Sequence, residues 1–94
     1  MHGGWVYIVA NKPHGMIYTG VTANLAERIA QHRSGRKFAK KYNLSLLVYA
    51  EPHPTMLEAI AREKAVKEWP RLSRLRLIQE SNPDWRDLYA TLNG

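Results

Sequence analysis

Two short runs of β-branched and aromatic residues near the start of the chain restrict its fold more than any other feature of the sequence. Residues 5–10 (WVYIVA) and 16–21 (MIYTGV) have the composition of β-strands, and the residues between them (NKPHG) are turn formers. The pattern predicts a β-hairpin and therefore an antiparallel sheet. We expect a third strand over residues 44–50 (LSLLVYA), ended by Pro52 and Pro54.

Capping signals predict the helices. Asn24 and Thr55 are suited to cap helix starts, and each is followed three residues later by a glutamate, Glu27 or Glu58, as in a capping box. Gly35 offers a left-handed stop for the first helix. The predicted helices cover residues 24–35, 55–69, 70–80 and 82–89. The order ββαβααα predicts an α/β (α+β) fold, a small three-stranded antiparallel sheet flanked by helices.

Length and composition limit the class of protein. A chain of 94 residues is enough for one compact domain and too short for two, so we expect a single domain over residues 1–94. Without cysteine, the fold contains no disulfide and no thiolate-bound zinc. No apolar run approaches the roughly 20 residues that span a bilayer, and no basic leader precedes the first strand. We therefore expect a cytoplasmic protein without a membrane partner.

The basic residues are clustered. Fourteen Lys and Arg against eight Asp and Glu give a formal net charge of +6. One cluster without an acid consists of Arg33, Arg36, Lys37, Lys40 and Lys41, and a second group consists of Arg71, Arg74 and Arg76. Such clusters favour a polyanion such as nucleic acid, because each phosphate contact releases counterions. A basic face that only aids solubility is the alternative.

Two predicted helices carry charged or polar side chains on their apolar stripes. In the first, Arg28 and His32 share the stripe of the apolar positions 25 and 29; in the second, Glu63 shares the stripe of positions 56, 59, 60 and 66. Arg28 is either an anion-binding residue or a side chain that reaches past the core edge. Glu63 either pairs with Arg28 or holds a hard cation through oxygen. Glu58 and Arg62 are expected to form an exposed ion pair.

The order of these features resembles the GIY-YIG nuclease domain, in particular its small stand-alone bacterial members, from residue 5 to residue 88. The first motif of that family falls on WVY at residues 5–7 and the second on YTG at residues 18–20, with ten residues between the two tyrosines. Trp5 and Thr19 depart from the motifs. The further matches are Arg28, His32, Glu63 and, near the C-terminus, Asn82, where an N-cap role before Pro83 is the alternative.

The resemblance implies an endonuclease that hydrolyses phosphodiester bonds in DNA with one divalent ion, Mg²⁺ or Mn²⁺. The implied site residues are Tyr7, Tyr18, Arg28, His32, Glu63 and Asn82. Glu63 would bind the metal, and either Tyr7 or His32 would be the general base. DNA structure is expected to direct cleavage more than base sequence, as in DNA repair or recombination, and no obligate protein partner is evident. The alternatives are a non-catalytic nucleic-acid-binding module and a protein-interaction domain.

Overall fold

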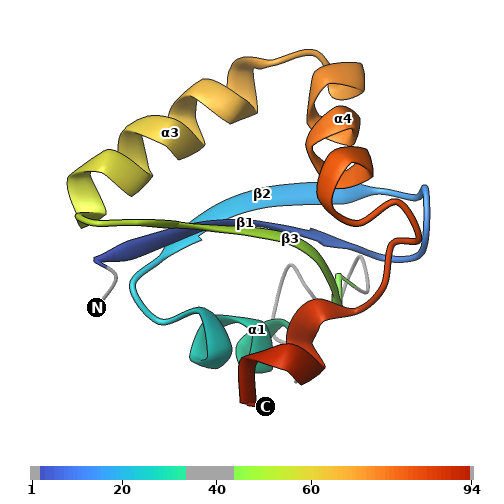
Figure 1. Ribbon diagram of the computed structural model, residues 1–94, viewed down its shortest axis with the longest axis horizontal. Coiled ribbons are helices and arrows are strands. Elements are labelled where there is room, and N and C mark those ends of the chain that lie inside the picture. The colour runs from blue at the N-terminus through green and yellow to red at the C-terminus, as the bar shows by residue number, and fades with distance from the viewer. Residues whose placement is uncertain (1–2, 34–43, 94) are drawn as a thin grey trace.

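The computed structural model of the protein describes residues 3–33 and 44–93 and confirms the predicted architecture, a three-stranded antiparallel sheet between two layers of helices (Figure 1). The strand order is β2-β1-β3, so β1 is central. Helices α3 and α4 cover one face, and α1 and η1 cover the other (Figure 1). The elements are β1 (Gly4–Ala10), β2 (Ile17–Thr22), α1 (Leu25–Arg33), β3 (Leu46–His53), α3 (Met56–Glu68), α4 (Arg71–Ser81) and the 3-10 helix η1 (Leu88–Asn93).

The predicted hairpin is present, and its turn is held by backbone and side-chain hydrogen bonds. Asn11 N donates to Met16 O over 3.2 Å, and the side-chain oxygen Oδ1 of Asn11 accepts from Met16 N over 2.8 Å. Within the turn, Gly15 N donates to Lys12 O over 3.0 Å. Because the turn fixes which residues of β1 and β2 face each other, it also fixes the register of the site described below.

The core lies on both faces of β1. Residues 6–10 of this strand are all buried, as expected for a central strand covered on both sides. The cluster on the α1 face contains Tyr7, Val9, Leu25, Ile29, Leu44 and Leu47. The cluster on the α4 face contains Ile8, Ala10, Val48, Ile78 and Trp85. None of the helices in the described ranges is long and apolar enough to cross a membrane.

Side-chain caps confirm the predicted starts of the first two helices. Thr55 has an extended backbone, and its Oγ1 accepts from Glu58 N over 3.1 Å. Asn24 Oδ1 accepts from Glu27 N over 3.1 Å, and Asn24 Nδ2 donates to the Glu27 carboxylate. Helix α4 begins one residue after Pro70, at Arg71. The predicted stop at position 35 lies outside the described residues.

Two predicted boundaries are wrong. Strand β3 does not stop at Pro52 but continues to His53, with Pro52 opposite Trp5. Because β3 is an edge strand, a proline that lacks an N–H group is compatible with it. The predicted last helix does not start at Asn82. The backbone of Trp85 is left-handed, with φ of 55°, which interrupts a right-handed helix, and η1 begins only at residue 88.

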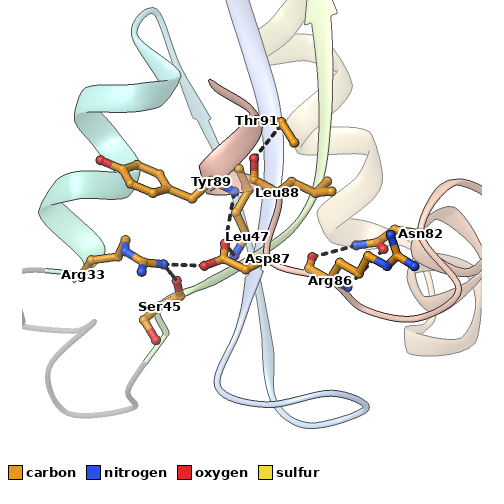
Figure 2. A network of polar contacts seen from close by, with 9 residues as sticks. All are labelled: Arg33, Ser45, Leu47, Asn82, Arg86, Asp87, Leu88, Tyr89 and Thr91. Carbon is orange, nitrogen blue, oxygen red and sulfur yellow. Dashed lines mark hydrogen bonds and ion pairs between the residues drawn. The ribbon is translucent and has the colours of Figure 1, made fainter. Parts of the chain in front are cut away.

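Strand β3 contains a β-bulge that the following segment covers. Ile8 and Val9 of β1 are adjacent, yet they face Tyr49 and Leu47, so Val48 is the extra residue. Asn82 Nδ2 donates to Val48 O over 3.1 Å. Figure 2 shows the same amide bound to the Arg86 backbone, with Nδ2 to O at 2.9 Å and Arg86 N to Oδ1 at 3.0 Å.

Asp87 binds the same strand one residue earlier. Its Oδ1 accepts from Leu47 N over 3.3 Å and from Tyr89 N over 3.1 Å, as Figure 2 shows. Together, Asn82 and Asp87 give hydrogen-bond partners to backbone groups that the ladder with β1 leaves free at the bulge. The chain after α4 is therefore fastened to the outer edge of β3.

Replacing Asn82 with Ala should lower the free energy of unfolding by about 3 kcal/mol, because buried backbone groups would lose their partners. Urea denaturation followed by circular dichroism measures this loss. Ser81→Ala is the matched control, since Ser81 is exposed and its hydroxyl donates to the helix carbonyl of Leu77; we expect a change of less than about 0.5 kcal/mol. Equal stability of the two variants would show that the amide does not hold the bulge.

Candidate active site

Tyr7 lies in the middle of the central strand, and its phenol crosses Gly20 of β2. The two residues are partners in the antiparallel register. A Cβ atom on Gly20 would lie 2.5 Å from Cζ of the Tyr7 ring, which is closer than real Cβ contacts come. Any larger residue at position 20 would therefore displace the ring. The glycine allows the Tyr7 hydroxyl to reach toward the β2 edge of the sheet while the side chain stays 1% exposed.

Tyr18 shares a sheet face with Tyr7. It is the partner of Val9, two residues after Tyr7, so the side chains of Tyr7, Val9 and Tyr18 all lie on the α1 face. Its ring is half-buried and packs against the cluster on that face. The hairpin thus places both predicted site tyrosines on one surface, on neighbouring strands.

His32 meets both tyrosines from the last turn of α1. Its Nε2 is 3.1 Å from the Tyr7 hydroxyl, a hydrogen bond whose direction depends on the tautomer. The centre of its ring lies 5.7 Å from that of Tyr7 and 6.0 Å from that of Tyr18. The other ring nitrogen, Nδ1, is buried and has no hydrogen-bond partner in the part of the chain that the structure describes. The three rings form one contiguous group.

Arg28 is exposed, so its side chain reaches past the edge of the core, as one of the two alternatives for this residue predicted. Leu25 and Ile29 fill the contact between α1 and the sheet, and Arg28 lies at its rim. An open pocket of about 300 Å³ lies there, between the end of β2, the start of α1 and Met56 of α3, and Arg28 lines it. The guanidinium is therefore accessible to a ligand while its charge still acts on Tyr7 and His32.

Burial and the neighbouring charges shift the pKa values of the paired groups. Burial raises the pKa of Tyr7 to about 12, although the charge of Arg28 and its hydrogen bonding to the phenol oppose the shift. Burial also lowers the pKa of His32 below its usual 6.5, and the positive charge of Arg28 lowers it further. At neutral pH the pair consists of a protonated phenol and a neutral imidazole.

Glu63 faces inward, as the sequence indicates, and is 9% exposed. Its partner is not Arg28 but Lys67, one turn later on α3, with Nζ 2.8 Å from Oε2. The same ammonium lies 5.4 Å from the centre of the Tyr18 ring. Bonding to Glu63 raises the pKa of Lys67. Lys67 is thus a site residue that sequence analysis missed, although its spacing of four residues from Glu63 was a visible signal.

The site forms along the free edge of β2. Helix α3 covers the face opposite to α1, yet the negative charge of Glu63 acts on the pKa of Tyr7, and Lys67 contacts the Tyr18 ring. These interactions are possible because β2 is an edge strand, around which side chains from both layers can meet. The structure therefore brings together Tyr7, Tyr18, Arg28, His32 and Glu63.

The donor set around Glu63 fits an open magnesium or manganese site. Mg²⁺ commonly uses one or two carboxylates and completes its shell with water and phosphate oxygens. Within residues 3–33 and 44–93, no group of three or more His, Asp or Glu side chains is placed to hold a metal ion. Among the described residues, Glu63 offers one buried carboxylate to such an ion, and Lys67 occupies one of its oxygens in the free protein.

The residues of the first basic cluster, which were predicted to bind nucleic acid, do not join this group of site residues within the described residues. Figure 2 shows Arg33 at the end of α1, where Nη1 is 2.6 Å from Asp87 Oδ2 and 3.0 Å from Ser45 O. Its guanidinium also lies 4.8 Å from the centre of the Tyr89 ring. The charge of Arg33 is thus partly used within the protein. The other members of the first basic cluster, Arg36, Lys37, Lys40 and Lys41, lie outside the described residues.

Asn82 and Arg62 bind partners other than those the sequence suggested. Asn82 is 6% exposed, and its side chain bonds the backbone of Val48 and Arg86 at the β3 edge. Arg62 does not pair with Glu58. It binds Glu51 of β3, with Nε 3.0 Å from Oε2, because β3 extends further than predicted and presents a carboxylate to α3.

Comparison with known proteins agrees with this arrangement. Residues 3–76 match the GIY-YIG catalytic domain family. Similar proteins include UPF0213 proteins from Staphylococcus haemolyticus and Staphylococcus saprophyticus, 38% and 37% identical over 78 residues, which are 81% of this chain and 94% of each relative. A UPF0213 protein from Desulfotalea psychrophila is 30% identical over 88 residues, 90% of this chain and 80% of that protein. No solved structure matches the chain with significance.

The sheet, the hairpin tyrosines and the family match define a domain of the nuclease class, for which nucleic acid is the substrate. The chain belongs to the GIY-YIG family, as a relative of the small UPF0213 proteins.

The electrostatic link between Arg28 and His32 can be measured directly. NMR titration of the histidine ring protons should give a pKa for His32 below 6.5. Arg28→Gln should move this pKa upward, because a nearby positive charge no longer opposes protonation, while burial keeps it below the ordinary value. Burial and the charge of Arg28 both disfavour the charged imidazolium, so removing either one raises the pKa of His32.

Arg33→Gln is the matched control for this titration. It removes the same charge one residue after His32, but from a guanidinium that is paired with Asp87. We expect the pKa of His32 to change less in this variant than in Arg28→Gln. A His32 pKa above 6.5, or an equal shift in both variants, would contradict the described geometry.

Proposed function

We propose that the protein is a metal-dependent endonuclease that hydrolyses phosphodiester bonds in DNA. The observation that carries the proposal is the hydrogen bond between the Tyr7 hydroxyl and His32. The charges of Arg28 and Glu63 also act on the pKa of this phenol. Phosphodiester hydrolysis needs an activated water, a positive charge near the phosphoryl oxygens and help for the leaving oxygen. These residues supply candidates for each need.

The Tyr7–His32 pair supports a route for the proton of the attacking water. With a pKa raised to about 12, the Tyr7 phenol keeps its own proton at neutral pH and does not accept another as a free base. The neutral imidazole of His32 is a better acceptor. We infer that Tyr7 hands its proton to His32 Nε2 as it takes one from water, so that the two residues act as one general base.

Arg28 is the candidate phosphate-binding residue. Its exposure and its position beside the open pocket allow a charged, forked contact with two phosphate oxygens, which a lysine would not reproduce. The phosphate would then lie within reach of the Tyr7 hydroxyl, since Arg28 also interacts with that phenol. This placement supports in-line attack by a water held at Tyr7.

Glu63 is the residue that would hold the divalent ion, Mg²⁺ or Mn²⁺. When bound, such an ion supplies positive charge to the phosphoryl and leaving oxygens. Glu63 would provide the carboxylate, and Lys67 pairs with that carboxylate in the free protein and packs on the Tyr18 ring. Tyr18 would orient Tyr7 or the attacking water. Asn82 remains a predicted site residue; its contacts support a positioning role through β3.

Specificity for DNA structure rather than base sequence remains part of the proposal. Base readout in a groove requires a helix or ribbon that can enter it, together with several side chains aimed at base edges. In the described residues, the candidate site lies along a sheet edge and presents Arg28 as a phosphate contact, which supports recognition of backbone and shape. Such recognition suits substrates met in DNA repair or recombination.

Replacing Glu63 with Gln should lower metal-dependent DNA cleavage by about a thousandfold, since metal charge stabilisation contributes several kcal/mol. Gel analysis of labelled single-stranded, duplex and branched DNA, with magnesium and with chelator, measures the rate. Glu58→Gln, an exposed carboxylate on the same helix, is the control and should keep the parent rate. The non-catalytic alternative holds if the parent binds DNA but yields no metal-dependent product.

Replacing Lys67 with Met should tighten Mn²⁺ binding by about threefold to tenfold, because the carboxylate of Glu63 loses the cation that competes with the metal. Mn²⁺ affinity is measured by electron paramagnetic resonance without DNA. Lys64→Met removes an exposed ammonium from the same helix and should leave the affinity unchanged. If Lys67→Met binds Mn²⁺ no more tightly than Lys64→Met, the ammonium does not compete for the metal site.

A further inference from the structure

A second pocket, of about 280 Å³, lies away from the tyrosines, beside the hairpin turn. It is lined by His14, Leu72, Leu75, Arg76, Gln79 and Trp85, and we call it the α4 pocket. Figure 1 shows that the turn between β1 and β2 lies at the same end of the sheet as α4. Arg71 fixes the turn to this helix, with Nη2 2.6 Å from Gly15 O. The pocket therefore has walls from three separate segments.

Two aromatic rings form one wall of the α4 pocket. The ring centres of His14 and Trp85 are 4.9 Å apart, with a tilt of 41° between the planes. Both residues have a left-handed backbone, with φ of 60° and 55°, and they are the two non-glycine residues of this kind in the described ranges. Residues other than glycine rarely adopt this backbone conformation. The surrounding fold therefore holds His14 and Trp85 in a backbone conformation that is locally unfavourable. His14 is exposed, whereas Trp85 is 3% exposed and supports it from behind.

The opposite wall is aliphatic and the rim is basic. Leu72 is 73% exposed and, with Leu75, presents an apolar surface to the pocket. Arg76 and Gln79 are exposed and provide hydrogen-bond donors, and none of the described residues that line the pocket is Asp or Glu. A flat apolar ring attached to an anionic group matches this combination: the ring packs between imidazole and leucine, and the anion faces the guanidinium.

We propose that the α4 pocket binds an unpaired nucleobase of a single-stranded nucleic-acid segment, whose adjacent phosphate contacts Arg76. Base stacking on aromatic side chains is tolerant of sequence, and only an unpaired base presents a free face, because bases in a duplex are already stacked. The choice of ligand rests on the proposed function, since a nuclease substrate supplies both the base and the phosphate. The α4 pocket would then select substrates with an unpaired strand.

The size of the protein sets the length of a suitable probe. The protein measures 29 Å along its longest axis, and a stacked strand advances about 3.4 Å per nucleotide. About ten nucleotides therefore exceed this length, and they lie within the range of site sizes known for single-strand-binding folds. An oligonucleotide of that length is a suitable probe, and it places a base in the α4 pocket without requiring a duplex.

The test compares two probes on the Glu63→Gln variant in chelator, so that no cleavage occurs. Fluorescence anisotropy gives the dissociation constants of an oligothymidylate of about ten nucleotides and of an abasic oligonucleotide of equal length. We expect the oligothymidylate to bind about tenfold more tightly. His14→Gly, which removes the ring and suits the left-handed backbone, should reduce this ratio to about twofold or less.

Two matched pairs of variants separate base binding from charge. Leu72→Ala should reduce the ratio, whereas Leu57→Ala, an equally exposed leucine on α3, should not. Arg76→Gln should weaken both probes, whereas Arg86→Gln, outside the pocket and 78% exposed at its side chain, should weaken them less. Thermal melts of each variant confirm folding.

Two results would overturn the α4 pocket as a nucleobase site. One is equal affinity of the two probes for the Glu63→Gln protein, and the other is an unchanged ratio of the two dissociation constants after His14→Gly and Leu72→Ala. Failure of the proposed function gives a different result: no metal-dependent cleavage by the parent protein, with the preference for oligothymidylate still present. If the parent protein cleaves DNA but the probes show no preference for the oligothymidylate, the proposed nuclease function stands and the proposed nucleobase site is wrong.

Discussion

The pairing of Tyr7 with Gly20 is the constraint on which the rest of the site depends. A buried phenol on a central strand normally packs into a core and does no chemistry. Here the missing side chain on the neighbouring strand lets the ring lie flat across the backbone, so that its hydroxyl reaches the sheet edge and His32. The hairpin turn sets this register, and a slip of one residue would turn the phenol to the other face.

The remaining polar groups are arranged around that phenol by charge. Helix α1 carries a positive side chain at the rim and a neutral acceptor inside, and α3 carries a buried carboxylate with its own ammonium. Burial alone makes the phenol a weaker acid, and Arg28 opposes that effect. At neutral pH the free protein thus holds both the Tyr7 phenol and the His32 imidazole in their neutral forms.

Features determined by local sequence were predicted well. The hairpin and the caps at Asn24 and Thr55 depend on residues within a few positions of each other. The inward direction of Glu63 followed from helical spacing. Features determined by distant partners were not predicted. Strand β3 continues past Pro52 because it is an edge strand. Arg62 pairs with Glu51, which lies on the part of β3 that was not predicted.

The structure brings together five residues that the sequence predicted for the site, both tyrosines, the arginine, the histidine and the glutamate, but not with all the contacts considered. The sequence left open whether Arg28 is exposed, because that depends on how much of α1 the sheet covers. It also did not predict that Lys67, rather than Arg28, is the partner of Glu63. The left-handed Trp85 also escaped prediction, since a local helix signal at residues 82–83 was overruled by packing of the indole.

The covered edge of β3 bears on how the protein behaves at high concentration. An open edge strand invites pairing with the edge of another molecule and is a common start of aggregation. At its bulge, the backbone of β3 already donates to Asp87 and accepts from Asn82, and the bulge twists the strand away from a regular ladder. The N–H of Leu47 and the C=O of Val48 are therefore not free to pair with the strand of another molecule.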